Sequence, residues 1–333
     1  MLRPVNRYYS KIVYSPSLKS KEIIETMKEN NITLMLGVPL LFEKIVEGLM
    51  RKVESAGLLK KLFFKSSMGL TKISKGIGKA LFKSVREALG MKHMKYVISG
   101  GAGLPEWVSD FLEKLGIPIL QGYGLTEASP VVSVNLPDKP KNKSIGLVIP
   151  DVDVKIDNPN EEGVGELLVR GPNVMLGYYK KPEETKKVIK NGWSYTGDLA
   201  KIDKDGYIYI KGRQKSVIVT HAGKNVYPEE VEAKILQSHY VKEVLVLGRI
   251  NPDTKREEVY AIIHPDYEHF EFDFKQLDEE KITNILKQEV KKYCAELADY
   301  KRVKKFEIRE EEFPKTTTKK IKRFLFQKKP VEV

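Results

Sequence analysis

Short apolar segments that each lead into a helix or a glycine-rich turn dominate the first third of the chain. Residues 32–38 predict a short buried strand, and Pro39 then opens a helix, because proline suits the first helical position. Residues 95–99 predict another strand, which runs into the glycine-rich turn 100–105 and then into a helix that begins at Glu106. Alternating strands and helices are typical of α/β folds, so this part of the chain is predicted to be an α/β domain.

A β-hairpin is predicted near the middle of the chain. A loop that ends in Asp198 precedes the turn Asp-Lys-Asp-Gly at 203–206, which leads into the alternating strand 207–211. An Asp-Gly turn between alternating segments is a strong local signal for a hairpin. The hairpin is expected to have Asp198 at one end and Arg213 at the other. An acid and an arginine beside a glycine bend indicate a polar site, although an ordinary hairpin with solvated charges has the same spacing.

Two domains are predicted. Residues 1–211 are expected to form an incomplete large α/β domain, in which residues 144–211 make a β-rich subdomain. Residues 212–333 are expected to form a small, mobile α+β domain. The acidic and aromatic stretch 268–275 within it is predicted to be a surface loop. The remaining elements expected in the small domain are helices at 228–238 and 278–299 and strands at 241–247 and 259–264.

Composition limits the classes of function. A chain of 333 residues with 41% apolar residues can bury two cores, and its net charge of +13 favours anionic partners such as nucleotides, coenzyme A, anionic lipids or nucleic acid. Nucleic acid is not expected, because no recognised nucleic-acid module is present. The single cysteine, Cys294, rules out a disulfide within the chain and fits a reducing cytoplasm. The five histidines form no pair with metal-ligand spacing.

A basic amphipathic helix is predicted over residues 70–89, where apolar residues recur at intervals of three and four. Lysines and Arg86 occupy its other faces, and Gly76 and Gly78 weaken it. Packing of the apolar face against the domain core with solvated lysines is the favoured interpretation. A peripheral contact with a membrane surface is the alternative.

Five short segments together carry a resemblance to a known family. They are Ser-Gly-Gly-Ala (99–102), Tyr-Gly-Leu-Thr-Glu (123–127), Tyr-Thr-Gly-Asp (195–198), Gly-Arg (212–213) and a lysine-rich segment that begins Pro-Lys-Thr (314–323). This set resembles the adenylate-forming superfamily of acyl-CoA synthetases, firefly luciferases and peptide-synthetase adenylation domains, and within it the long-chain fatty-acid–CoA ligases. The last segment departs from the family pattern, since Lys319 stands where glycine is usual.

In the amino-terminal part, the resemblance implies a nucleotide site. Gly100, Gly101 and Ala102 are expected to line the adenine pocket, and Tyr123, with Gly124 beside it, is expected to stack on the adenine ring. Thr126 is expected to contact the α-phosphate, and Glu127 is expected to ligate Mg²⁺. The residues implied as catalytic here are therefore Thr126 and Glu127.

In the rest of the chain, the resemblance implies a ribose site, a hinge and a catalytic lysine. Asp198 is expected to hold the ribose hydroxyls of ATP with help from Arg213. Lys215 falls at the hinge of the small domain, about which closure is expected to complete the active site. The catalytic lysine aligns with Lys320, with the neighbouring Lys319 as the alternative.

The activity that the resemblance implies is an ATP-dependent acid–thiol ligase. A carboxylate, expected to be a fatty acid, attacks the α-phosphate of magnesium-bound ATP to give an acyl adenylate, and coenzyme A then displaces AMP. Other adenylate-forming reactions share these motifs, such as luciferase-like oxidation or the loading of a carrier protein. A remnant that binds nucleotide or acyl groups without catalysis is a further alternative.

One expected motif is missing. The family carries a Ser/Thr- and Gly-rich loop that ends in Pro-Lys-Gly and holds the β- and γ-phosphates, and this sequence contains no such loop. The chain is therefore expected to be a truncated or split enzyme, with a separate N-terminal half as one expected partner, and it can be inactive alone. The large sheet should then expose an apolar surface and an unpaired strand edge.

Overall fold

The computed structural model describes most of the chain, and the chain divides into two compact units. The described residues are 11–17, 19–55, 57, 64, 66–69, 75–221, 223–251, 254–274, 278–316 and 320–326. Unit 1 comprises residues 1–154, 169–194 and 202–209, and unit 2 comprises residues 155–168, 195–201 and 210–333. The domain boundary at 211/212 stays a prediction.

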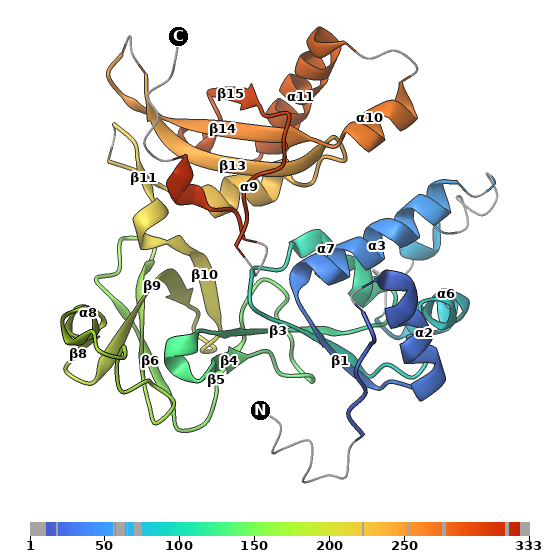
Figure 1. Cartoon of the computed structure of the whole chain (residues 1–333), viewed down its shortest axis with the longest axis horizontal. Helices are drawn as coiled ribbons and strands as arrows, with labels where there is room; N and C mark the ends of the chain where they lie inside the picture. The colour runs from blue at the N-terminus through green and yellow to red at the C-terminus, as the bar shows by residue number, and fades with distance from the viewer. Residues whose placement is uncertain are drawn as a thin grey trace. The chain divides into compact units, whose positions relative to one another are not determined.

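A five-stranded sheet forms the centre of unit 1 (Figure 1). Its strand order is β1-β2-β3-β4-β5; the first three strands are parallel, and β4 and β5 are each antiparallel to the strand before. The predicted succession of strand, glycine turn and helix is confirmed, since β2 ends at Ser99 and α7 begins at Glu106. The strands are β1 (Leu34–Gly37), β2 (Tyr96–Ser99), β3 (Ile119–Gly124), β4 (Val131–Val134) and β5 (Leu147–Val148).

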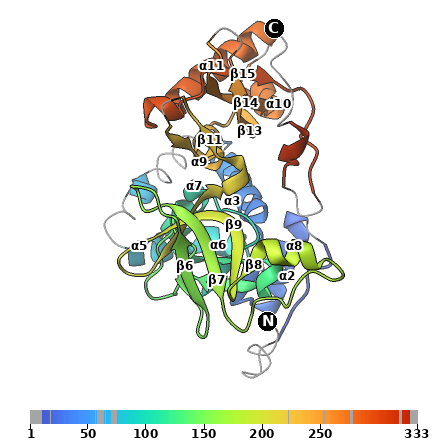
Figure 2. The ribbon, with the colours of Figure 1, turned by 90° about the vertical axis from the view of Figure 1, so that its left-hand side faces the viewer.

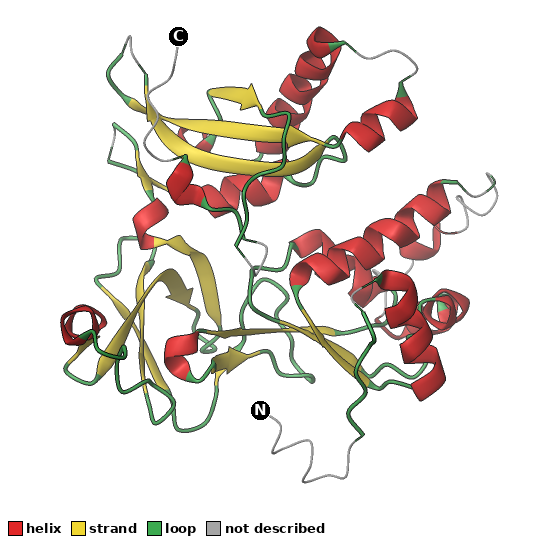
Figure 3. Cartoon of the chain, in the orientation of Figure 1, coloured by secondary structure: helices red, strands yellow, loops and turns green. Residues whose placement is uncertain are grey.

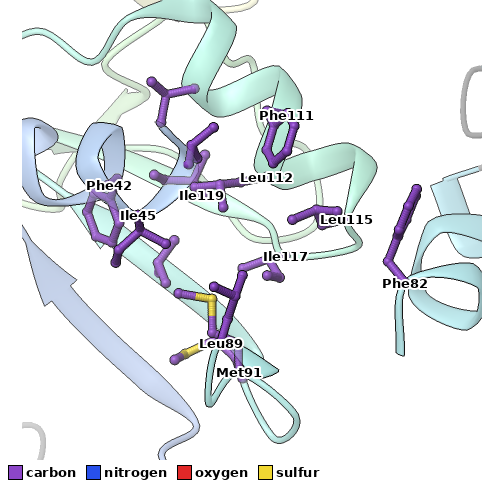
Figure 4. Close-up of a cluster of buried hydrophobic side chains, with 14 of the residues drawn as sticks. Phe42, Ile45, Phe82, Leu89, Met91, Phe111, Leu112, Leu115, Ile117 and Ile119 are labelled. Atoms are coloured by element: carbon purple, nitrogen blue, oxygen red, sulfur yellow. The ribbon is translucent and has the colours of Figure 1, made fainter. Parts of the chain in front are cut away.

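One face of the parallel strands is covered by helices. Met35, Val97 and Ile119 lie side by side on this face, because the strand register pairs them across the sheet. They pack with buried side chains from the helices and from the segments that join them, among them Phe42, Phe82 and others labelled in Figure 4. The helices of unit 1 around this core are α2 (Ser20–Asn30), α3 (Pro39–Glu54), α5 (Lys75–Leu81), α6 (Lys83–Ala88) and α7 (Glu106–Lys114).

The opposite face of the same strands is apolar and partly uncovered. The register places Leu36 beside Ile98, and Ile98 beside Leu120. The exposed fraction is 56% at Leu36 but only 3% at Leu120, so cover is lost toward β1. Parallel strands are ordinarily covered on both faces. Among the described strands, β1 pairs with β2 alone, so the expected apolar surface and open edge are present, while the prediction of a fully buried strand at 32–38 is wrong.

The predicted basic helix is two helices where the structure describes it; residues 70–74 lie outside the described part. α5 and α6 are separated at Phe82, whose side chain is 2% exposed and belongs to the core of unit 1. Leu81, Val85 and Leu89 pack in the same core, which favours the interpretation of a core-facing stretch over a membrane contact. In the described part of the chain, no helix combines the length and the apolar character that crossing a bilayer requires.

Two glycines explain how α5 packs. A Cβ on Gly78 would lie 2.1 Å from the carbonyl oxygen of Lys114 at the end of α7. A Cβ on Gly116, which has a φ of +74°, would lie 2.8 Å from the backbone nitrogen and Cα of Lys79. The backbones of α5 and of the segment after α7 therefore approach each other at two glycines. Gly78, which the sequence suggests as a weakness of the helix, is required by this contact.

Arg86, which the periodicity places away from the apolar face, is buried in the structure. Its side chain is not solvated but only 4% exposed, and Nη2 donates to the carbonyls of Met91, Lys92 and Met94 at 3.4 Å each. Burial lowers the pKa of the guanidinium. The carbonyl oxygens stand in for the water that a surface arginine would have. Arg86 thus closes the turn between α6 and β2.

A second sheet contains the predicted hairpin (Figure 2). Its strand order is β10-β9-β7-β6, and the short β8 pairs with β9. The turn at 203–206 is closed by Asp203, whose side-chain oxygen accepts from the N–H groups of Asp205 and Tyr207. The elements are β6 (Asp153–Asp157), β7 (Gly165–Arg170), α8 (Pro182–Val188), β8 (Ile189–Lys190), β9 (Trp193–Ile202) and β10 (Ile208–Arg213).

The carboxyl-terminal part of unit 2 is a three-stranded sheet with helices, shown by secondary structure in Figure 3. The strand order is β13-β14-β15, with β13 antiparallel and β15 parallel to β14. A short pair, β11 and β12, precedes it. The elements are η2 (Gln214–Ser216), β11 (Ile218–Val219), β12 (Asn225–Val226), α9 (Pro228–Ile235), β13 (Val241–Ile250), β14 (Glu257–Pro265), α10 (Tyr267–Asp273), α11 (Glu279–Cys294), η3 (Asp299–Lys301), β15 (Lys305–Ile308) and η4 (Arg323–Leu325).

The predicted surface loop at 268–275 is wrong over most of its length, because α10 occupies residues 267–273. The Asp266 side chain caps this helix by accepting from the backbone N–H of His269. Phe270 is fully buried and packs in the core of unit 2 with side chains of α9, α11 and the sheet. The alternation of acids and aromatics therefore marks an amphipathic helix and not a linker.

Candidate functional site

Two of the predicted nucleotide-binding segments lie side by side in unit 1. Parallel strands β2 and β3 end at the same edge of their sheet, where Ser99 pairs with Gln121. Gly100 follows directly, and a Cβ there would lie 3.4 Å from the carbonyl oxygen of Gly122. Gly101 has a φ of +88°, and no atom lies within 4 Å of the position that its Cβ would take. The turn at Gly100, Gly101 and Ala102 thus offers an open backbone surface, and Gly101 and Ala102 are exposed.

The second of these segments, residues 123–127, begins near the end of β3. The ring of Tyr123 is partly buried against a small cluster around Ala128 and Val132. Gly124 has no room for a side chain, because a Cβ would lie 1.8 Å from the carbonyl oxygen of Pro130. The same oxygen accepts from the N–H of Leu125 at 2.8 Å, which closes the turn.

The short helix η1 (Thr126–Ala128) then presents Thr126 and Glu127. The Thr126 side chain is exposed, and Glu127 is half-buried. Oε1 of Glu127 accepts from the Tyr178 hydroxyl at 2.9 Å, and its backbone carbonyl accepts from the N–H of Met175 at 2.8 Å. Asn173 donates from Nδ2 to the carbonyls of Ala128 and Val131. Residues 173–178 therefore hold the turn that carries the predicted Mg²⁺ ligand.

Tyr178 is a site residue that sequence reasoning missed. Its segment, Gly-Tyr-Tyr-Lys-Lys, resembles the family but suggests no role by itself. Burial raises the pKa of the Tyr178 phenol, and the hydrogen bond to Glu127 raises it further. The phenol therefore stays protonated at neutral pH and donates to the carboxylate. The two residues lie 51 positions apart in the sequence, so their contact leaves no local periodic pattern that could predict it.

Asp198 and Arg213 come together in unit 2. Arg213 Nε lies 2.8 Å from Asp198 Oδ1, and Nη1 donates to the carbonyl of Thr196 at 3.2 Å. Asp198 lies within β9, and the antiparallel strand β10 returns Arg213 to its side. Asp198 is 5% exposed, whereas the Arg213 side chain is 55% exposed. The pair therefore places a buried carboxylate beside a guanidinium that reaches solvent.

The backbone next to Asp198 is held by the neighbouring strand. Thr196 donates from Oγ1 to the carbonyl of Leu167 at 2.7 Å, and it accepts from the N–H of Asp198 at 3.1 Å. The Glu166 carboxylate accepts from the N–H of Gly197 at 2.9 Å, where φ is +70°. Left-handed backbone of this kind favours glycine, which accounts for the Thr-Gly-Asp order.

Lys320 occupies an exposed turn of unit 2, and Lys319 lies outside the described residues. The N–H of Lys320 donates to Thr316 Oγ1 at 3.1 Å, and its carbonyl accepts from the N–H of Thr316 at 2.8 Å. Lys215 lies in η2, where the backbone turns between β10 and β11. It also lines a cavity of about 200 Å³ that Arg323 shares. Its role as a hinge stays a prediction.

The chemistry available differs between the units. Unit 1 offers exposed glycine backbone, an aromatic ring, a hydroxyl and an oriented carboxylate. A single carboxylate suits Mg²⁺, since this ion takes oxygen ligands and in nucleotide sites shares them with phosphates. Among the described residues, no cluster of three or more His, Cys, Asp or Glu side chains could hold a metal ion. Unit 2 offers a buried carboxylate with its arginine, and an exposed lysine whose backbone is hydrogen-bonded to Thr316.

Known proteins are similar in sequence to this chain. Residues 10–179 match the family described as AMP-binding enzyme, and residues 230–320 match the AMP-binding enzyme C-terminal domain. The long-chain-fatty-acid–CoA ligase of Bacillus subtilis (strain 168) is 36% identical over 243 residues, which are 70% of this chain and 40% of that protein. The enzyme of the same name from Escherichia coli O157:H7 is 44% identical over 160 residues, which are 45% of this chain and 28% of that one.

Solved structures agree with these matches. ATP-bound MatB from Rhodopseudomonas palustris has a TM-score of 0.69 at 25% identity, over 98% of this chain and 56% of that one. The o-succinylbenzoate CoA synthetase of Bacillus subtilis, solved with its acyl-adenylate intermediate, has a TM-score of 0.71 at 21% identity, over 100% of this chain and 58% of that one. The chain thus spans less than half of these two curated relatives and just over half of these solved structures. From its two matched regions and its fold, this chain belongs to the AMP-binding enzyme family.

Proposed function

We propose that this chain takes part in the ATP-dependent activation of a fatty acid to an acyl adenylate and in the transfer of the acyl group to coenzyme A. The observation that carries the proposal is the turn at 123–127, whose carboxylate is oriented by Tyr178. The names of the relatives from Bacillus subtilis and Escherichia coli support a long-chain fatty acid as the substrate. Coenzyme A as the acceptor is supported in the same way.

In the first reaction, a carboxylate oxygen of the fatty acid attacks the α-phosphorus of ATP, and pyrophosphate leaves. Gly100, Gly101 and Tyr123 would bind the adenine, and Thr126 would donate to an α-phosphate oxygen. Glu127 would hold Mg²⁺, which when bound neutralises charge on the phosphates. Tyr178 keeps the Glu127 carboxylate in one orientation, because hydrogen bonds from neighbouring groups fix the geometry of a metal ligand.

Unit 2 would contribute a ribose contact and a positive charge. The Asp198 carboxylate would accept hydrogen bonds from the ribose hydroxyls while Arg213 holds it in place. Lys320 would stabilise the negative charge that develops at the α-phosphate, as preorganised cations do in phosphoryl transfer. In the second reaction, the thiol sulfur of coenzyme A attacks the acyl carbonyl, AMP leaves, and the thiol proton passes to solvent.

The partly uncovered sheet of unit 1 supports the further proposal that a separate N-terminal half binds this chain. The surface runs over Leu34, Leu36, Tyr96 and Ile98 and ends at the open edge of β1. The relatives contain a large additional portion, since this chain spans 40% of the Bacillus subtilis protein. A strand and a covering layer from that portion would complete the parallel sheet.

The proposed partner surface can be tested with the amino-terminal part of the Bacillus subtilis relative. We expect Leu36→Lys to weaken its binding to this chain at least about tenfold, because a charge replaces a buried apolar contact. Leu136→Lys is the control, since Leu136 is also exposed, at 42%, but lies outside the β1 surface. Binding would be measured by titration calorimetry. Equal binding by both variants would contradict the proposal that the N-terminal half binds the β1 surface. If only Leu36→Lys loses self-association of this chain, a second copy of the chain binds that surface instead.

The activity itself is tested by pyrophosphate release. We expect release from ATP that requires a long-chain fatty acid when the chain is mixed with the amino-terminal part of the relative. Thioester formation with coenzyme A should follow. Transfer to a carrier protein but not to coenzyme A would change the acceptor. Nucleotide binding without release of pyrophosphate, in a complex that has been shown to form, would favour a non-catalytic remnant.

Asp198→Asn is expected to weaken ATP binding about tenfold, because a charged acceptor for the ribose hydroxyls becomes a neutral one. The substitution keeps the size of the side chain, so the fold should survive the loss of the ion pair with Arg213. Asp205→Asn is the matched control, because Asp205 lies in the turn of the same hairpin and pairs with Lys141. Titration of each variant with ATP measures the effect, and equal affinities would remove Asp198 from the ribose site.

A further inference from the structure

The turn that carries Lys320 is closed by backbone contacts. Lys315 and Ile321 form an isolated antiparallel bridge, and the N–H of Lys322 donates to the carbonyl of Pro314 at 2.9 Å. The hydrogen bonds between Thr316 and Lys320 lie inside this bridge. A long lysine side chain on an exposed turn has many conformations, so its position depends on how firmly the turn is attached to the domain.

The residues just before the turn, 312–315, are attached to β13. The Lys315 ammonium pairs with Glu243 of β13 and lies 3.0 Å from Glu312. The N–H of Phe313 donates to the other oxygen of Glu243 at 2.9 Å. The Phe313 ring is 3% exposed and meets the ring of Phe326 edge-on, with centroids 5.3 Å apart. An ion pair and an apolar ring contact therefore both hold the residues just before the turn.

The residues just after the turn are attached through Arg323, which lies three residues after Lys320. Its Nη1 donates to the carbonyl of Val246 at 3.0 Å, and its Nη2 pairs with Glu232 of α9. Glu232 is 8% exposed, and its Oε1 accepts from the N–H of Val246 at 2.6 Å. Burial raises the pKa of Glu232, while Arg323 and the Val246 N–H oppose that shift. Arg323 and Glu232 thus join the end of the turn to both α9 and β13.

This pair lies near other groups of the same unit. Arg323 Nη2 is 3.9 Å from Glu229 Oε1. Arg323 lines the cavity of about 200 Å³ together with Lys215, the predicted hinge residue, and with residues 216–218 and Glu257. Arg323, which attaches the Lys320 turn, and Lys215, the predicted hinge residue, therefore line the same cavity.

We propose that Glu232 and Arg323 are positioning residues that hold the Lys320 turn in a fixed place on β13 and α9. The proposal rests on the proposed function for the meaning of that position, but the attachment itself does not. A buried ion pair is a poor source of stability, because desolvation of its charges offsets their attraction. A role in fixing one arrangement of the turn accounts for it better. Neither residue touches the substrate in this role; each acts through Lys320.

Amide hydrogen exchange of the full chain tests the attachment without any activity. In Glu232→Gln and Arg323→Met, the amides of Thr316, Lys320 and Lys322 should exchange at least about tenfold faster than in the wild type, because local opening becomes easier. Glu230→Gln is the matched control, since Glu230 also lies on α9 and pairs with Lys301 at 2.8 Å, away from the turn. It should leave these amides unchanged.

A double variant separates local from global effects. Removal of one partner leaves a buried charge unpaired and can destabilise the whole unit. Glu232→Gln combined with Arg323→Met removes both charges, so its unfolding midpoint should lie near that of the wild type while the three amides still exchange fast. Slow exchange of these amides in the folded double variant, or exchange in it as fast throughout β13 as in the turn, would overturn the proposal.

The two half-reactions test the meaning of the attachment. With the amino-terminal portion of the relative present, Glu232→Gln should lower pyrophosphate release about tenfold and spare thioester formation from a supplied acyl adenylate. In a chain that already carries Lys320→Ala, Glu232→Gln should cause no further loss, because it acts through that lysine. A further loss would show a general structural role. If the wild type releases no pyrophosphate, the proposed function fails, and hydrogen exchange still decides the attachment.

Discussion

Lys320→Ala is expected to lower pyrophosphate release by about 10²- to 10³-fold, the range found when one preorganised group that stabilises transition-state charge is removed. The side chain of Lys320 is exposed, and its hydrogen bonds with Thr316 involve only its backbone. The substitution should therefore leave the turn and the unfolding midpoint unchanged. Thioester formation from a supplied acyl adenylate should also be spared, since no charge develops at an attacked phosphorus in that step.

The measurement needs the amino-terminal portion of a relative, a long-chain fatty acid and ATP, with pyrophosphate followed continuously. Lys322→Ala is the control, because it removes the same charge two residues farther along the same turn. Loss of both half-reactions to the same extent would contradict the assigned role. A loss in Lys322→Ala as large as that in Lys320→Ala would show that the net charge of the turn matters and not one ammonium group.

Gly124→Ala is expected to destabilise unit 1 by about 3 kcal/mol, at the upper end of the usual range for overpacking. The added methyl group would lie 1.8 Å from the carbonyl oxygen of Pro130 and 2.7 Å from its carbonyl carbon. Both atoms belong to backbone that is held by the hydrogen bond from Leu125, so no side-chain rotation relieves the clash. The turn with Thr126 and Glu127 would have to move.

Denaturant unfolding, followed by circular dichroism, measures this effect. Gly103→Ala is the matched control: no atom lies within 4 Å of its Cβ position and its φ is not left-handed, so its midpoint should stay near that of the wild type. Gly101→Ala should lie between the two, at about 1 kcal/mol, because it has open space but a φ of +88°. An unchanged midpoint for Gly124→Ala would mean that the turn adapts at little cost.

Features with local causes could be predicted from the sequence. The order of β2, glycine turn and α7 follows from an apolar segment, a glycine cluster and an acid in the first helical turn. The hairpin of β9 and β10 follows from its Asp-Gly turn. The glycines at 100 and 101 and the turn at 123–127 are adjacent because parallel strands end at one edge of a sheet. The open edge of β1 was expected from the missing phosphate-binding motif.

Features that depend on distant contacts could not be predicted. Tyr178 reaches Glu127 across 51 positions, and Arg323 reaches Glu232 across 91. The helix breaks at Phe82, whose backbone leaves the helical conformation with φ −103° and ψ 24° while its ring packs in the core of unit 1, although the residues on both sides have helical periodicity. The helix α10 is a different case, because its cap is local: Asp266 lies just before the acidic and aromatic stretch and accepts from the N–H of His269. The contacts of Tyr178, Arg323 and Phe82 come from packing that no single segment encodes.

The two-glycine contact between α5 and the end of α7 limits how related sequences can change. Sliding α5 by one residue along its axis would bring a side chain against the Lys114 carbonyl. An insertion or deletion inside this helix should therefore prevent unit 1 from folding. Gly78 and Gly116 should then vary together across homologues or stay invariant, whereas length changes should concentrate in the neighbouring connections. In an alignment of orthologues, the columns of Gly78 and Gly116 should therefore be enough to recognise this close contact between α5 and the segment after α7.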